Sequence, residues 1–243
     1  MLKAINLTKS FGNRKVLRGF SITVEPGEIV TLIGVNGAGK TTLLRILSGI
    51  TSAEIGQVQF NNIPSRDDPS FYRRQIGVVL HAPMLYGNLS ARENLRFFSR
   101  LYQLPHPEER IDELLQMVNL RSRANDMVRV FSRGMQQRLS IARALLHDPA
   151  CLLLDEPYTG LDQDSSSVFE SLILRAVEDK KMVLLATHDL DKACRTSTRI
   201  DLLQQGRIAF TQPRFDVSPE ELAETYREIT GTQPVKHAAG DAG

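Results

Sequence analysis

The stretch that decides the fold is Gly34-Val35-Asn36-Gly37-Ala38-Gly39-Lys40-Thr41. It matches the pattern G-x-x-x-x-G-K-[ST], in which the glycines let backbone N–H groups curl around phosphate oxygens. An apolar run at 28–33 predicts a buried strand before it, and residues 42–49 predict a helix after it, so a chance glycine-rich turn is the weaker interpretation. The stretch therefore predicts a nucleotide site in which Lys40 reaches the β- and γ-phosphates and Thr41 binds Mg²⁺.

Composition limits the class of protein. The chain has 243 residues, of which 42% are hydrophobic and 24% charged, with a net charge of +2. It is long enough for a substantial core, and its charge gives no sign of binding to nucleic acid. Because it lacks an apolar run of about 18 residues and a signal-peptide pattern, we expect it to be soluble by itself. Cys151 and Cys194 lack metal-ligand spacing and are expected to be reduced thiols, although two cysteines could pair.

Period-two patterns predict two antiparallel strands, at 2–8 and 16–24, ahead of the phosphate loop. Between them, the turn at 10–13 carries Phe11, which is either a core residue or a platform on which an adenine ring stacks. A polar loop is expected at 61–70. Further strands are predicted at 55–60, 75–80, 151–156, 182–186, 200–203 and 207–210.

Helical spacing dominates the middle of the chain. It occurs at 91–104, 107–120 and 138–146 and predicts a helical subdomain inserted into the α/β core. Its second half is basic, which usually means a solvated face and in a minority of proteins a face toward phosphate. The arginines are Arg121, Arg123, Arg129, Arg133, Arg138 and Arg143. Two more helices are predicted at 162–176 and 218–229, and a disordered tail at 231–243.

Polar side chains follow three of the predicted buried strands. His81 follows the strand at 75–80, Asp155 and Glu156 end the strand at 151–156, and His188 follows the strand at 182–186. Because the carboxyl ends of parallel strands meet at the ligand crevice of an α/β sheet, we expect these groups to converge there. An aspartate in that position suits Mg²⁺, and an adjacent glutamate can polarise the attacking water. A lone histidine is more often structural, but convergence favours a functional role.

A second anion site is predicted at Phe131-Ser132-Arg133-Gly134-Met135-Gln136-Gln137-Arg138, which opens a helix. The hydroxyl of Ser132 and the free amides of the helix N-terminus can meet an anion. Since the phosphate loop already holds one nucleotide, this site makes best sense if it serves the nucleotide of another subunit.

With this segment the sequence resembles the ABC transporter ATPases, whose signature is Leu-Ser-Gly-Gly-Gln followed by Gln-Gln-Arg. Ser132 and Gly134 keep the serine and the second glycine, while Arg133 and Met135 replace the first glycine and the last residue. The resemblance spans residues 2 to about 211. It implies an α/β P-loop NTPase fold with a RecA-like parallel-sheet core, an N-terminal antiparallel β-subdomain and a helical subdomain at about 88–148, within one ATPase domain at 2–230.

The resemblance also implies roles for single residues. Glu156 corresponds to the catalytic base and His188 to the switch histidine at the γ-phosphate, and residues 159–162 resemble the D-loop. His81 stands where the family has its Q-loop glutamine, so it is counted among the catalytic residues and, with Thr41 and Asp155, among the Mg²⁺ ligands. The implied ATP-binding residues are Phe11, Gly34, Asn36, Gly37, Ala38, Gly39, Lys40, Thr41, Thr42, Ser132 and Gly134.

The partners implied by the resemblance are a second ATPase subunit and a membrane permease. Two ATPase subunits, identical or different, would trap two ATP molecules head to tail and dock peripherally on the cytoplasmic side of the cell membrane. The permease would dock near residues 81–95, where Met84, Leu85 and Tyr86 are either that dock or core. No nucleic acid is expected as a partner.

Residues 81–95 and 131–138 look most like the ATPase subunits of haem exporters of cytochrome c maturation. ATPase subunits of drug or polysaccharide exporters are the alternative. A soluble ABC ATPase acting on ribosomes or DNA is another class, but such proteins usually carry two ATPase units or a long coiled coil. A regulatory module that binds ATP without hydrolysing it is disfavoured by Glu156 and His188.

The histidine at position 81 generates a pH prediction. An imidazole takes up a proton near about pH 6.5, which would place a cation beside Mg²⁺. We therefore expect that the ATPase is active with histidine in place of the Q-loop glutamine, and that its rate falls as the solution is acidified from about pH 8 to about pH 5.5. In the variant His81→Gln, the part of the fall in ATPase rate that is due to the histidine should be absent. A native ATPase rate that stays constant over this pH range would contradict the prediction.

Overall fold

The sheet at the centre of the molecule contains three adjacent strands that are buried along their whole length. The computed structural model describes residues 1–213 and 218–234. All five residues of β3, β7 and β8 are buried, as parallel strands covered on both faces must be. The sheet has the order β10-β9-β3-β8-β7-β6, and only β10 pairs antiparallel. The bounds are β3 Ile29–Ile33, β6 Ile76–Val79, β7 Cys151–Asp155, β8 Met182–Ala186, β9 Arg199–Gln204 and β10 Arg207–Pro213.

Alternate residues of these strands enter two different cores, because successive side chains of a strand point to opposite faces. In β7, Cys151 and Leu153 join the cluster that includes α1 (Lys40–Leu47) and the N-terminal strands. Leu152 and Leu154 join the cluster formed with α3 to α6 on the other face. The central sheet therefore separates these two hydrophobic cores, and its residues Ile33, Ile200 and Leu202 enter a third core with Leu190, Ala193 and Leu222.

The second sheet is antiparallel and has the order β2-β1-β4-β5. Its strands are β1 Leu2–Phe11, β2 Arg14–Val24, β4 Ile55–Phe60 and β5 Ile63–Pro64. Two arginines tie it to the central sheet: Arg14 donates to the carbonyl of Gly37 at 3.4 Å, and Arg199 donates to that of Thr23 at 2.7 Å. These contacts fix the β1–β2 hairpin beside the phosphate loop.

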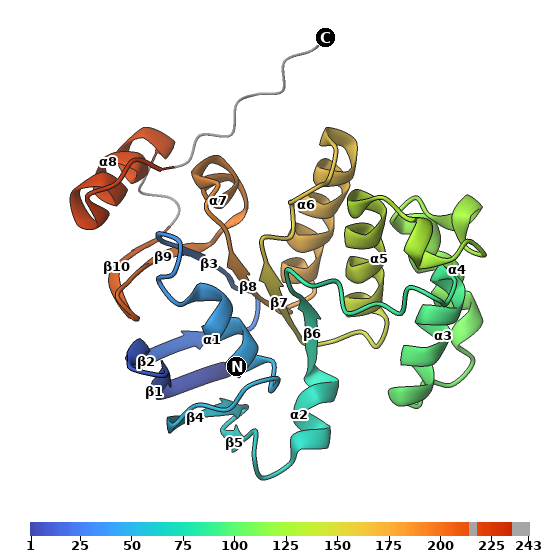
Figure 1. Cartoon of the computed structure of the whole chain (residues 1–243), viewed down its shortest axis with the longest axis horizontal. Coiled ribbons are helices and arrows are strands. Elements are labelled where there is room, and N and C mark those ends of the chain that lie inside the picture. The colour runs from blue at the N-terminus through green and yellow to red at the C-terminus, as the bar shows by residue number, and fades with distance from the viewer. Residues whose placement is uncertain (214–217, 235–243) are drawn as a thin grey trace.

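Three helices, α3, α4 and α5, follow β6 and precede β7 in the chain, and they gather at one end of the molecule (Figure 1). The first begins at a capping box formed by Ser90 and Glu93. Asp162 caps α6 by accepting a hydrogen bond from the N–H of Ser165 at 2.8 Å. The helices are α2 Pro69–Gln75, α3 Ala91–Leu101, α4 Pro107–Met117, α5 Arg133–Leu145, α6 Gln163–Glu178, α7 Leu190–Thr196 and α8 Pro219–Thr230, with 3₁₀ turns at Arg121–Arg123 and Val128–Val130.

The predicted α/β class, the antiparallel N-terminal sheet and the helical middle segment are confirmed. Two local predictions were incomplete. The expected loop at 61–70 contains β5 and the start of α2, which Asp68 caps. Helix α7 was not foreseen. Helix α5 begins at Arg133, within the segment 131–138 that was predicted to open a helix.

Cys151 and Cys194 are both buried and are not joined in a disulfide, as expected for reduced thiols. In the described part of the chain, no helix combines the length and the apolar character needed to cross a bilayer. Helix α8 ends at Gly231, whose positive φ of 68° suits glycine. Most of the predicted tail, at 235–243, lies outside the described residues.

Gly77 in β6 offers a test of how tightly the central sheet is packed. A Cβ at this position would lie 2.4 Å from the carbonyl oxygen of Ala144 and 2.7 Å from Pro149. Gly77→Ala should therefore lower the free energy of unfolding by about 1–3 kcal/mol, measured by urea denaturation. Gly87→Ala is the matched control, because its nearest heavy atom would be 3.6 Å away, and equal losses in the two variants would contradict the packing argument.

Candidate active site

The phosphate loop turns back over its own lysine. Gly34 has φ +152°, and a Cβ there would lie 2.3 Å from the carbonyl oxygen of Leu203. Gly39, at φ +116°, ends the loop and precedes α1. The ammonium of Lys40 is buried and donates to the carbonyl of Gly34 at 2.6 Å, so it lies under the loop. Within the predicted set, Ala38 is buried, Thr42 is half-buried, and Asn36, Gly37 and Thr41 are exposed.

Asp155 lies beside this loop and is 3% exposed. Burial raises the pKa of its carboxyl and the charge of Glu156 adds to the effect, while a hydrogen bond with Thr41 and the charges of Lys40 and His81 oppose it. Burial in turn lowers the pKa of Lys40, and Glu156 and Asp155 oppose that shift. The Oδ2 atom of Asp155 is buried without a hydrogen-bond partner among the described residues. An unpaired buried carboxylate oxygen of this kind fits a cation.

Glu156 is held by the next strand. Its backbone has a positive φ of 49°, and its N–H donates to the carbonyl of Ala186 at 2.9 Å. The carboxylate accepts a hydrogen bond from the Thr187 hydroxyl at 3.2 Å and lies 2.7 Å from Nδ1 of His188. Since an ionised carboxylate only accepts, the hydrogen of this contact belongs to the imidazole. Thr187 was missed from the sequence, although its place beside His188 at a strand end could have identified it.

His81 follows β6 and is exposed. It lines a cavity of about 230 Å³ together with Asp155, Glu156 and Arg133. The cavity brings the ends of β6 and β7 together with the N-terminus of α5, as the prediction of converging strand ends required.

The signature segment forms the start of α5. Ser132 caps the helix by accepting a hydrogen bond from the N–H of Met135 at 3.3 Å. A Cβ on Gly134 would lie 2.3 Å from the carbonyl oxygen of Gly160, so packing against the D-loop by itself requires glycine here. The segment borders a groove of about 330 Å³, and among the described residues that line it none belongs to 34–42. Ser132 and Gly134 therefore face a different cavity from the phosphate loop of their own chain.

Phe11 ends β1 and its side chain is 56% exposed. The ammonium of Lys9 lies 5.6 Å from the centre of the ring. The core interpretation is therefore wrong, because the ring is open to solvent at the edge of the hairpin. Adenine stacking at this position stays a prediction.

The site supplies few metal ligands of its own. Among the described residues, no group of three or more His, Cys, Asp or Glu side chains could hold a metal ion. Mg²⁺ in nucleotide sites characteristically takes one or two protein ligands and completes its shell with water and substrate phosphates. The pair Thr41 and Asp155 has that character.

Comparison with known proteins settles the family. The model of the ABC transporter family matches residues 17–159, a span from β2 to the D-loop. The chain belongs to the ABC transporter family. Like other ABC ATPases it is an ATP-binding, ATP-hydrolysing module of a transporter. The phosphate loop lies within the matched span, and so does β7, the Walker B strand of this family, with its carboxylates Asp155 and Glu156.

Individual relatives agree with this assignment. The chain is 35% identical to the ABC transporter ATP-binding protein NatA of Bacillus subtilis over 81% of each chain. It is 31% identical to the linearmycin resistance ATP-binding protein LnrL of the same species, covering 95% of this chain and 75% of the relative. It is 36% identical to the Nod factor export ATP-binding protein I of Cupriavidus metallidurans, covering 90% of this chain and 74% of the relative.

Solved structures show the same fold. The ATP-binding cassette MJ0796, solved as a dimer in a post-hydrolysis state with ADP and phosphate, superposes with a TM-score of 0.80 at 31% identity. The match covers 88% of this chain and 99% of that one. The α/β P-loop architecture expected from the sequence is thereby confirmed.

Proposed function

We propose that this chain is the ATPase motor of an ABC exporter and works from the cytoplasmic face of the membrane. The observation that carries the proposal is that one loop, at 80–90, connects two features. At its start His81 lines the cavity of the Walker B carboxylates, and further along Met84 lines an open groove. Such a loop can pass the state of the nucleotide to a partner seated in the groove. The names of relatives such as LnrL and the Nod factor export protein favour export.

In the proposed mechanism, Glu156 takes the proton of the attacking water. Thr187 and His188 hold its carboxylate from the neighbouring strand, which fixes its direction. His188 is proposed to meet the γ-phosphate, and Lys40 to leave its carbonyl partners for the β- and γ-phosphates. Gly34 to Thr42 would bind the phosphates through backbone amides, and Phe11 would stack on the adenine.

Mg²⁺ is proposed to bind at Thr41 and Asp155, with His81 nearby. The unpaired Oδ2 atom of Asp155 supports this assignment. When bound, the ion neutralises phosphate charge as bond breaking develops.

We further propose that two ATPase subunits act head to tail. Ser132 and Gly134 face a groove apart from their own phosphate loop, so a second subunit is needed to bring a nucleotide to them. The dimer described for MJ0796 is consistent with such a pair. The domain at 2–230 would thus work as one half of a clamp.

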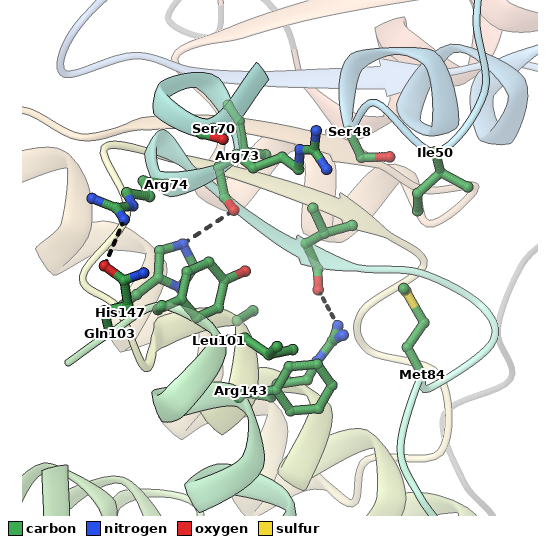
Figure 2. Close-up of a pocket in the computed structure, with 15 residues that line it drawn as sticks. Ser48, Ile50, Ser70, Arg73, Arg74, Met84, Leu101, Gln103, Arg143 and His147 are labelled. Carbon is green, nitrogen blue, oxygen red and sulfur yellow. Dashed lines mark hydrogen bonds between the residues drawn. The ribbon is translucent and has the colours of Figure 1, made fainter. Parts of the chain in front are cut away.

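The membrane partner is proposed to dock in a groove of about 470 Å³ between the core and the helical segment (Figure 2). Of the three residues predicted to be either dock or core, Met84 and Tyr86 are 45% and 49% exposed, whereas Leu85 is half-buried and packs against the core of the helical segment. The loop that carries them is fixed to the helices: Asn94 donates to the carbonyl of Tyr86 at 3.0 Å, and Ser140 donates to that of Pro83 at 3.0 Å. The groove therefore moves with the loop.

The cargo is decided by the membrane subunit. Haem export for cytochrome c maturation stays our prediction from residues 81–95 and 131–138, although the relatives named above concern linearmycin resistance and Nod factor export. A drug or polysaccharide exporter is the alternative.

Glu156→Gln tests the role of the general base. The variant should lose about 10²–10⁴-fold in ATP turnover, because the amide cannot take the proton, while ATP binding remains. Turnover is measured as phosphate release and binding by equilibrium titration with ATP. Unchanged turnover in a folded variant would falsify the assignment.

Pull-down of the tagged chain from detergent-solubilised native membranes tests the transport function. We expect polytopic membrane subunits to co-purify and to change the steady ATPase rate, because the groove couples them to the site. Their identity distinguishes haem-type from drug-type export. Recovery of ribosomes, of nucleic acid or of no partner would count against a transporter and toward a soluble ABC ATPase.

A further inference from the structure

The groove between the core and the helical segment is basic as well as apolar. Fifteen described residues line it; three are arginines and none is Asp or Glu. Arg73 and Arg74 come from α2 and are exposed at the rim, whereas Arg143 comes from the last turn of α5. Because the net charge of the chain is only +2, this concentration of cations is local.

Arg143 lies on the floor of the groove and is 7% exposed (Figure 2). It donates to the carbonyl of Val78 at 2.6 Å, and its guanidinium lies 5.2 Å from the ring centre of Phe98. Its Nε atom is buried without a hydrogen-bond partner, and among the described residues it forms no ion pair.

A buried cation without an anion is costly, and a carbonyl, an aromatic ring and the C-terminal end of a helix offset only part of the cost. Burial lowers the pKa of Arg143, and no carboxylate contributes to the opposite effect. The surrounding surface is apolar at the rim, where Met84 is 45% and Leu101 62% exposed. Apolar rim residues need an apolar partner surface, so a free anion alone would leave them uncovered.

We propose that a cytoplasmic segment of the membrane subunit fills this groove with an apolar face and places one carboxylate against Arg143. This inference rests on the proposed transport function and names the chemistry of its partner. Arg73 and Arg74 at the rim add attraction for further acidic side chains of the same segment, since charge complementarity guides docking. The geometry of the planar guanidinium suits a carboxylate.

Arg143 connects two elements that lead to the nucleotide site, helix α5 and strand β6. Helix α5 is capped by Ser132, which faces the proposed nucleotide of the second subunit, and carries Arg143 in its last turn. The same guanidinium holds the carbonyl of Val78 in β6, two residues before the loop that carries His81. A carboxylate at Arg143 therefore contacts a side chain that joins the signature helix to the strand leading to His81.

Cross-linking in the captured complex tests the proposal. Arg143→Lys introduces an amine at the same place, and a zero-length carbodiimide joins an amine only to a carboxylate in contact with it. The complex is captured from native membranes with the full-length tagged variant, treated with the carbodiimide and mapped by mass spectrometry. Arg175→Lys, on the exposed face of α6 outside the groove, is the matched control.

A cross-link from position 143 to Asp or Glu of a membrane subunit, absent from the control, supports the proposal. A captured subunit without that cross-link overturns it and leaves the transport function standing, and a cross-link to a soluble protein also overturns it. If the native chain captures no membrane subunit, both the transport function and this inference fail.

A second pair of variants covers the case in which Arg143→Lys lowers the Tm too far for capture. Arg73→Gln combined with Arg74→Gln changes only exposed side chains, so folding is retained. Loss of capture by about tenfold or more, with unchanged basal ATPase rate, then supports the docking of an acidic segment. Capture equal to that of the native chain overturns it.

Discussion

The active site depends on the register between β7 and β8. Their parallel pairing sets Asp155 opposite Ala186, so the residues that follow each strand emerge side by side. Glu156 turns through a positive φ and donates to the carbonyl of Ala186, and Thr187 and His188 then hold its carboxylate. A shift of one residue would direct Asp155 to the other face of the sheet, where it would meet the helices instead of the phosphate loop.

Helix α5 contacts several of the segments that surround the active site. At its start Ser132 caps the helix, and one turn later Gln137 donates to the carbonyl of Pro157 at 2.9 Å, next to the Walker B carboxylates. Ser140 then holds the loop at Pro83, and Arg143 holds β6 at Val78. These contacts connect the signature, the Walker B end and the loop after His81 to one helix.

The sequence predicted the elements of the site better than their surroundings. Strand ends could be placed because the buried apolar runs stop at polar residues, and the glycines of the phosphate loop mark its turns. The exposure of Phe11 could not be predicted, because it depends on how the β1–β2 hairpin pairs. The contact of Gly134 with Gly160 is equally hidden, since it joins two loops far apart in the chain. Periodicity predicted that Arg143 lies in a helix but not that it faces the groove, because α5 is buried on most of its faces between residues 139 and 144.

The hydrogen bonds that Gln137, Ser140 and Arg143 of α5 form with neighbouring segments have free energies that suit the coupling of two binding sites. Each is a hydrogen bond, worth about 0.5–1.5 kcal/mol net, and bonds that involve the arginine reach about 1.5–3 kcal/mol. Each tie by itself is therefore comparable with the coupling free energies of about 1–3 kcal/mol that link ligand sites in proteins. Much weaker ties would let the groove drift free of the nucleotide, and much stronger ones would hold the helical segment in one position whatever the nucleotide. In the proposed mechanism, the contacts of Gln137, Ser140 and Arg143 would therefore let the nucleotide and the membrane partner bias the same movement.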